Sequence, residues 1–166
     1  MLYLVIISAI LLIGFITFGL IKFGVLGSYS AYSAKWYTIC PKISLWSIVT
    51  FVAAALLIPV LIELGEGNNF QFLGFFAPVY LIGVSLTPKW ESDKHEHKYH
   101  MIFAILCAIC GVAWCLFIAK TWWILLMVGL IWIVVGWMSD TLKSSLTLIG
   151  ELIAFFSMYW SLMTIM

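Results

Sequence analysis

The stretch LYLVIISAILLIGFITFGLI, residues 2–21, contains no charged side chain, and five more predominantly apolar stretches follow it along the chain. A helix that crosses the hydrocarbon core of a bilayer needs about 20 mostly apolar residues, and its backbone polar groups must bond within the helix. The six stretches are residues 2–21, 43–62, 70–87, 101–119, 122–138 and 146–165. The sequence therefore predicts an all-α, polytopic membrane protein, with six transmembrane helices in one bundle and a single transmembrane domain over residues 1–166.

The composition supports the same interpretation. Of 166 residues, 65% are hydrophobic and 9% are charged, and the mean hydropathy is +1.17. A soluble domain of this size cannot bury so much apolar surface. Residues 2–21 have no positive charge ahead of Lys22 and are apolar for longer than the core of a signal peptide, so we expect them to be a retained helix.

The lysines are divided unequally between the two sides of the predicted bundle. Only Lys120 lies in a gap on one side. Lysines in short loops are retained in the cytoplasm, which places the other side inside and both termini outside. We expect a multi-pass protein of the cell membrane, the inner membrane if the source is bacterial. The lysines of the inner side are Lys22, Lys35, Lys42, Lys89, Lys94, Lys98 and Lys143.

The chain contains no arginine, and its formal net charge is +1. Bidentate recognition of phosphate or carboxylate depends on guanidinium groups, for which a lysine supplies only a point charge. Binding to nucleic acid also requires a basic surface, which this balance of charges does not provide. We therefore expect no nucleic-acid partner, and membrane lipid is the partner that the sequence implies directly.

Glu151 is the one carboxylate within the predicted spans. It follows residue 146 by one and a half turns, which places it about 8 Å into the apolar region at 1.5 Å per residue. An ionisable side chain there faces a partner or a water-filled cavity, which makes Glu151 a functional candidate. The alternative is a hydrogen bond between helices that fixes their packing. Its expected companions on the same side are His100, Lys22, Ser28, Ser30 and Ser33.

The most polar run of the chain, residues 89–100, carries three histidines. Imidazole and carboxylate groups are ligands for zinc, and in a helix that begins early Asp93, His97 and His100 share one face. The run also alternates in charge, which is typical of a solvated helix end. A zinc site at these three residues and a plain polar cap are both open. No other cofactor is expected.

Two further patterns involve aromatic residues. Residues 27–37 alternate small side chains with tyrosine and tryptophan, which predicts a short helix, either anchored in the membrane interface or lining an entrance to a site. His100, Cys107 and Trp114 recur every seven residues, so they share one side of a helix that can face the bundle interior. Trp114 lies deep in its span, where the indole N–H needs a partner. The C-x2-C of Cys107 and Cys110 lies in the same span and favours packing over metal binding.

The middle of the chain resembles small uncharacterised multi-pass membrane proteins of bacterial and phage genomes. The resemblance rests on the order of five features along the chain: residues 30–37, Leu57-Ile-Pro59, residues 70–73, His100 and Trp114. The likeness covers roughly the middle of the chain. It implies a six-helix membrane fold and carries no activity.

Three classes of function fit these residues. The first is a binding or structural membrane protein that works as a homo-oligomer or as a subunit beside another membrane protein, and it requires nothing beyond what is visible. The second is a small transporter or channel that uses Glu151 and His100 on the cytoplasmic side, which requires polar side chains on several helices. The third is a membrane-embedded, metal-dependent hydrolase, which requires a third ligand beside His97 and His100. The sequence favours the first, and we predict no catalytic residue.

Overall fold

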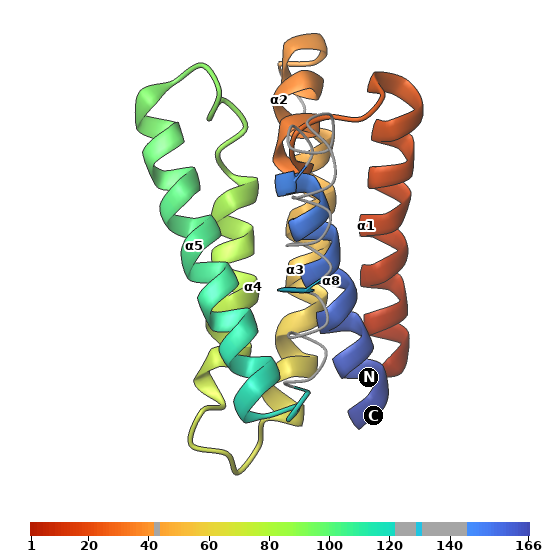
Figure 1. Cartoon of the computed structure of the whole chain (residues 1–166), viewed down its shortest axis with the longest axis vertical. Helices are drawn as coiled ribbons and strands as arrows, with labels where there is room; N and C mark the ends of the chain where they lie inside the picture. Colours follow the sequence, from red (N-terminus) through yellow and green to blue (C-terminus); the bar gives the residue numbers. More distant parts are fainter. Residues whose placement is uncertain (42–43, 122–128, 131–145) are drawn as a thin grey trace.

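The computed structural model describes residues 1–41, 44–121, 129–130 and 146–166. Within these ranges the chain forms six helices and no strand. Five helices run along the length of the molecule, and the short helix α2 lies at one end (Figure 1). The helices are α1 (Leu2–Phe23), α2 (Tyr29–Ile39), α3 (Leu45–Leu64), α4 (Phe72–Ser85), α5 (Lys94–Phe117) and α8 (Leu146–Ile165).

The order of packing follows the chain. Helix α3 packs between α1 and α4, and α4 packs against α5. Helix α8 contacts α1, α2 and α5, so the last helix joins the first to the middle of the bundle. The two termini lie together at the end of the molecule opposite to α2 (Figure 1).

Four of these helices are long and apolar enough to cross a membrane: α1, α3, α5 and the Thr147–Ile165 part of α8. They fit a membrane protein and confirm the helical class that hydropathy predicts. The expected span 70–87 is a shorter apolar helix, Phe72–Ser85. Asn68 begins the turn before it by accepting a hydrogen bond from the backbone of Phe70, and Pro88 disfavours helical backbone at the residue before it. The expected span 122–138 lies almost wholly outside the described residues.

Helix α5 begins earlier than its apolar run. Asp93 caps it by accepting hydrogen bonds from the backbone N–H groups of His95 and Glu96, so the polar residues from Lys94 onward are helical. The expected short helix after α1 is present as α2. Its first turns are buried in the bundle, and the anchor in the membrane interface and the lining of an entrance both stay predictions.

Glycines allow the closest contacts between helices. A methyl group added at Gly74 of α4 would lie 2.7 Å from the carbonyl oxygen of Leu61 in α3. Small residues at such crossings allow dispersion contacts between backbones where water provides no driving force. Pro59 and Pro78 lie inside α3 and α4. The cavity beside Pro78 measures only about 40 Å³.

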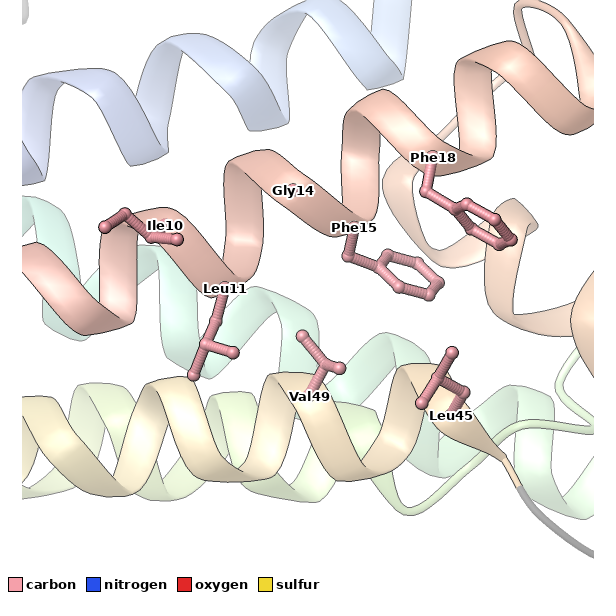
Figure 2. Close-up of a pocket in the computed structure, with 7 residues that line it drawn as sticks. All are labelled: Ile10, Leu11, Gly14, Phe15, Phe18, Leu45 and Val49. Atoms are coloured by element: carbon pink, nitrogen blue, oxygen red, sulfur yellow. The ribbon is translucent and has the colours of Figure 1, made fainter.

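The outer faces of the bundle are apolar. On α1, Ile10 and Ile13 are 63% and 64% exposed, and on α5 Ile109 is 58% exposed. A groove of about 290 Å³ lies between α1 and α3. Figure 2 shows Phe15 and Phe18 of α1 on the side of that helix that faces Leu45 and Val49 of α3. Such faces match a hydrocarbon solvent and not water.

Buried hydroxyl groups connect the helices inside. Ser8 of α1 donates to the carbonyl oxygen of Ala53 at 2.8 Å and also bonds to the Tyr159 hydroxyl of α8. Thr121 and Ser161 form a second hydroxyl pair, at 2.7 Å. Each pair satisfies polar groups that would be costly to leave unbonded in lipid.

The charged residues of the connections fall at opposite ends of the bundle. The end of α1, helix α2 and the connection from α4 to α5 lie at one end, and the connection from α3 to α4 lies at the other (Figure 1). The first end, called here the lysine-rich end, carries five of the six described lysines together with Glu91, Asp93 and Glu96, whereas the second carries Glu63, Glu66 and Lys120. The five are Lys22, Lys35, Lys89, Lys94 and Lys98.

Candidate ligand-binding cavity

The start of α2 is fixed by local chemistry. Gly24 ends α1 with a φ of 72°, a backbone conformation that favours glycine, and the chain turns back toward the bundle. Ser28 then caps α2, its Oγ accepting the backbone N–H of Ala31 at 3.0 Å. The first turn of α2 is therefore anchored before any contact with α8 is made.

Helices α2 and α8 provide hydrogen-bond acceptors for the unpaired backbone N–H groups of each other's first turns. The backbone N–H groups that begin a helix have no partner within it. The Glu151 carboxylate accepts the N–H of Tyr29 at 2.5 Å, and the carbonyl of Gly27 accepts the N–H of Leu148 at 2.9 Å. A carboxylate at the N-terminus of a helix is also favoured by the helix dipole. Glu151, which the sequence marks as a buried acid needing a partner, therefore connects the last helix to α2.

His100 is held on the other side of the same region. It is 3% exposed, and its Nδ1 lies 2.8 Å from the Thr87 hydroxyl. When that hydroxyl donates its proton to the Val84 carbonyl, 2.8 Å away, it accepts from the imidazole. In the neutral ring, this assigns the proton to Nδ1 and leaves Nε2 as an acceptor.

Trp90 joins α2 to the start of α5. Its ring stacks on His100 with centroids 4.8 Å apart and planes at 15°. Its Nε1 donates to the carbonyl of Ser30 at 3.2 Å. The connection before α5 is thus attached both to the histidine and to the backbone of α2.

These residues surround a cavity of about 470 Å³ at the lysine-rich end, named here the polar cavity. Three elements far apart in sequence contribute to it: the start of α2, the start of α5 with the connection before it, and the start of α8. A volume of this size accommodates a small molecule. Its walls are formed by Gly27, Ser28, Ser30, Ala31, Trp90, Glu91, His100, Met101, Ala104, Thr147 and Glu151.

The residues selected from the sequence divide into two groups. Glu151, His100 and Ser30 lie together on the walls of the polar cavity. Ser33 and Trp114 are fully buried elsewhere, and neither the Ser33 Oγ nor the Trp114 Nε1 has a hydrogen-bond partner in the described part of the chain. The roles assigned to these residues remain predictions.

Lys22 lies outside the polar cavity. Its ammonium group is 4.3 Å from the ring centroid of Trp36, a cation–π contact at the end of α1. The expected pairing of this lysine with Glu151 is absent from the described contacts.

The proposed zinc ligands have other partners. Asp93 caps α5, the His97 Nδ1 lies 3.1 Å from the Trp90 carbonyl oxygen, and the His100 Nδ1 faces Thr87. Among the described residues, no three His, Cys, Asp or Glu side chains gather closely enough to hold a metal ion. The zinc site remains a prediction from sequence that no described contact favours.

Several residues of the site were not selected from the sequence. Trp90 and Glu91 were treated as part of a charged run, and Thr87 as the end of a span. Tyr29 is also central: it is 2% exposed, and its hydroxyl lies 3.1 Å from that of Thr50 in α3. Burial raises the pKa of Tyr29, so its hydroxyl keeps its proton. A serine directly before a run of helix-forming residues is a sequence signal that could have indicated the cap at Ser28.

Comparison of the chain with protein-family models, curated proteins and solved structures found no match, so its function has to be inferred from the geometry of the site.

Proposed function

We propose that this chain is a small multi-pass membrane protein of the binding type, and that the polar cavity is its ligand site. The proposal retains the six spans, both termini outside and the lysine-rich end in the cytoplasm of a cell-membrane protein. The unequal distribution of the described lysines, five at the lysine-rich end and only Lys120 at the other, supports this orientation, because basic loops remain inside.

One observation carries the proposal: an acid, an imidazole and two serines meet at a cavity of about 470 Å³, although they come from separate helices. Polar side chains in a bundle of this kind usually bond to one another and close the space between helices. Among the described residues, Glu151 and His100 each form one side-chain hydrogen bond, and both still line open space. Convergent polar groups around a concave space are the usual features of a binding site.

We further propose that the chain acts as a homo-oligomer or as a subunit in a complex with another membrane protein. Its outer faces support this, because an apolar groove such as that in Figure 2 accepts either lipid chains or a neighbouring helix. A stable higher-order species across mild detergents is expected, and a strictly monomeric protein would contradict this part.

The binding site is tested by filling it. In the Ala104→Phe variant a phenyl ring enters the polar cavity, whereas Ala108→Phe adds the same ring to an exposed position of the same helix. The measurement is the thermal unfolding midpoint of purified protein with small amines, polyols or carboxylates. At least one class should raise the midpoint of the wild type and of Ala108→Phe, but not that of Ala104→Phe. If no class stabilises the wild type, or if Ala104→Phe responds equally, the polar cavity is not a binding site.

A second candidate is a transporter or channel. The hydroxyl pairs inside the bundle favour it, because they place polar groups on α1, α2, α3 and α8 beyond the polar cavity. If substrate or protons pass through, Glu151→Gln should abolish a pH-dependent flux in proteoliposomes, and unchanged flux would remove the carboxylate from the mechanism. The metal-dependent hydrolase has no comparable observation in its favour.

A further inference from the structure

The charge on the walls of the polar cavity is negative. Glu151 lies at its α8 side and Glu91 beside Trp90, and none of its described wall residues is basic. The N-terminus of α2 offsets part of the charge of Glu151, since a helix end is equivalent to about half a unit charge. With both glutamates ionised, a net negative charge remains, at the end of the molecule where lysines are most frequent.

Two lysines near this region are held away from the polar cavity. Lys22 lies over the ring of Trp36 at 4.3 Å, and Lys89 lies over the ring of Tyr37 at 5.5 Å. Neither is one of the cavity residues. Lys22 and Lys89, which are close to the polar cavity in the sequence, therefore do not pair with its carboxylates. These carboxylates can pair with a cation from a ligand.

The polar atoms of the walls are mainly acceptors. With the Thr87 hydroxyl donating to Val84, Nε2 is the acceptor of the neutral His100 ring. Glu151 contributes a carboxylate, and Ser28 and Ser30 contribute hydroxyl oxygens, with their Oγ atoms 3.2 Å apart. An ammonium group has three N–H donors and no acceptor, which complements such a set.

The remaining wall residues complement the cation itself and the carbon atoms to which an ammonium group is attached. The ring of Trp90 offers an aromatic surface that attracts a cation, and Met101 with Ala104 forms an apolar part for carbon atoms. A carboxylate or phosphate ligand would meet two glutamates and no guanidinium group, which is unfavourable.

We infer that the polar cavity binds a ligand through a primary ammonium group, which rests on the proposal that the cavity is a binding site. The Glu151 carboxylate provides the charge partner, and Nε2 of His100 with the serine hydroxyls accepts the remaining N–H donors. The group belongs either to a small free amine or to the headgroup of an aminophospholipid.

The test uses the full-length protein in phosphatidylcholine nanodiscs, with ethanolamine as the free amine. Phosphatidylcholine has a quaternary ammonium group without N–H donors, so it serves as the background. Ethylene glycol is the matched probe in which a hydroxyl replaces the ammonium group. Ethanolamine should raise the unfolding midpoint in a saturable way, and ethylene glycol should not.

Variants separate the charge of the polar cavity from charge in general. Glu151→Gln keeps an oxygen that can accept the Tyr29 N–H, so we expect it to fold and to weaken ethanolamine binding about tenfold or more. Glu91→Gln should weaken binding about twofold, because Glu91 is exposed and screened by solvent. Glu63→Gln removes an exposed acid at the opposite end and should leave binding unchanged.

The source of the ammonium group is resolved by adding phosphatidylethanolamine to the nanodiscs. If this lipid stabilises the protein and weakens the response to free ethanolamine, the ligand is a headgroup; if it does neither while free ethanolamine still binds, the ligand is a free amine. Equal effects of ethanolamine and ethylene glycol, or unchanged binding in Glu151→Gln, would overturn the inference. If only carboxylates or polyols stabilise the wild type, and this effect is lost in Ala104→Phe, the polar cavity is a binding site but its ligand is not an ammonium compound. If nothing binds, both fall.

Discussion

The two halves of the bundle use their interiors differently. Away from the lysine-rich end, α3 and α4 meet at Gly74, and Trp114 is fully buried in an apolar cluster with Val5 and Leu61. The space left there, near Pro78, is about 40 Å³, whereas at the lysine-rich end about 470 Å³ remains among α2, α5 and α8. The first half is therefore closely packed, whereas the second leaves open space among its helices. Removal of a contact should therefore cost the most stability in the first half, whereas in the second it should cost less stability and also change ligand binding.

The largest effect is expected at the helix crossing. Gly74→Ala places a methyl group 2.7 Å from the backbone oxygen of Leu61, so α3 and α4 must separate, and we expect a loss of about 2 kcal/mol in unfolding free energy. Gly111→Ala is the matched control, because nothing lies within 4 Å of its added methyl group. That control should be neutral or stabilising by about 0.5 kcal/mol, as for glycine to alanine in a helix. Reversible unfolding in detergent compares the two, and equal losses would refute the close crossing.

The next largest loss of stability is expected when the hydrogen bond between α8 and α2 is removed. Glu151→Ala leaves the Tyr29 N–H without its acceptor, which we expect to cost about 1.5 kcal/mol. Glu151→Gln keeps an acceptor and should cost about 0.5 kcal/mol, mainly the charge at the helix N-terminus. The same unfolding measurement applies. An alanine variant as stable as the wild type would mean that Glu151 does not hold α2.

The cap of α2 should have a smaller effect. Ser28→Ala removes the oxygen that accepts the Ala31 N–H, at a cost of about 1 kcal/mol. Proteolysis within residues 24–28 reports on the release of α2 directly. Ser92→Ala, an exposed serine that bonds only to the Lys89 carbonyl within the described residues, should change neither quantity. Equal sensitivity of the two variants would contradict the capping role.

The smallest effect concerns the hydroxyl pair between α2 and α3. A double-mutant cycle with Tyr29→Phe and Thr50→Val should give a coupling of about 0.6 kcal/mol, typical of hydrogen bonds between helices in a membrane. Both hydroxyls are buried, so each single variant leaves one polar group unpaired. A coupling near zero would show that the 3.1 Å contact contributes nothing to the position of α2.

Hydropathy predicts the long helices well because it measures the property that lipid selects. The expected span 146–165 has the same limits as α8, Leu146–Ile165. Hydropathy fails to predict the start of a helix that continues into polar sequence. Helix α5 is such a helix, because it begins at Lys94, where the cap at Asp93 sets its start. Hydropathy also overestimates α4, since apolar residues at the ends of the stretch 70–87 belong to turns.

The polar cavity was only partly predictable. Burial of a carboxylate in a span is costly enough to mark Glu151, and the same side of the membrane suggested His100 and Ser30 as companions. The sequence could not show that Lys22 contacts the ring of Trp36 and not Glu151, because the position of Lys22 at the end of α1 is compatible with either contact. It also could not reveal Trp90, whose stacking on His100 depends on how the connection before α5 folds back.

Access from one face of the membrane tests the central claim most directly. Ala31 lies on a wall of the polar cavity and Ala113 packs against the apolar cluster of the other half, and both are half-buried alanines. Each is replaced by cysteine in a chain whose native cysteines are removed, and a membrane-impermeant maleimide is applied to sealed vesicles of either orientation. The Ala31→Cys variant should react only when the cytoplasmic face is exposed, and Ala113→Cys should react in neither. An unreactive Ala31→Cys, or its labelling from the outer face, would contradict a water-accessible cavity at the lysine-rich end.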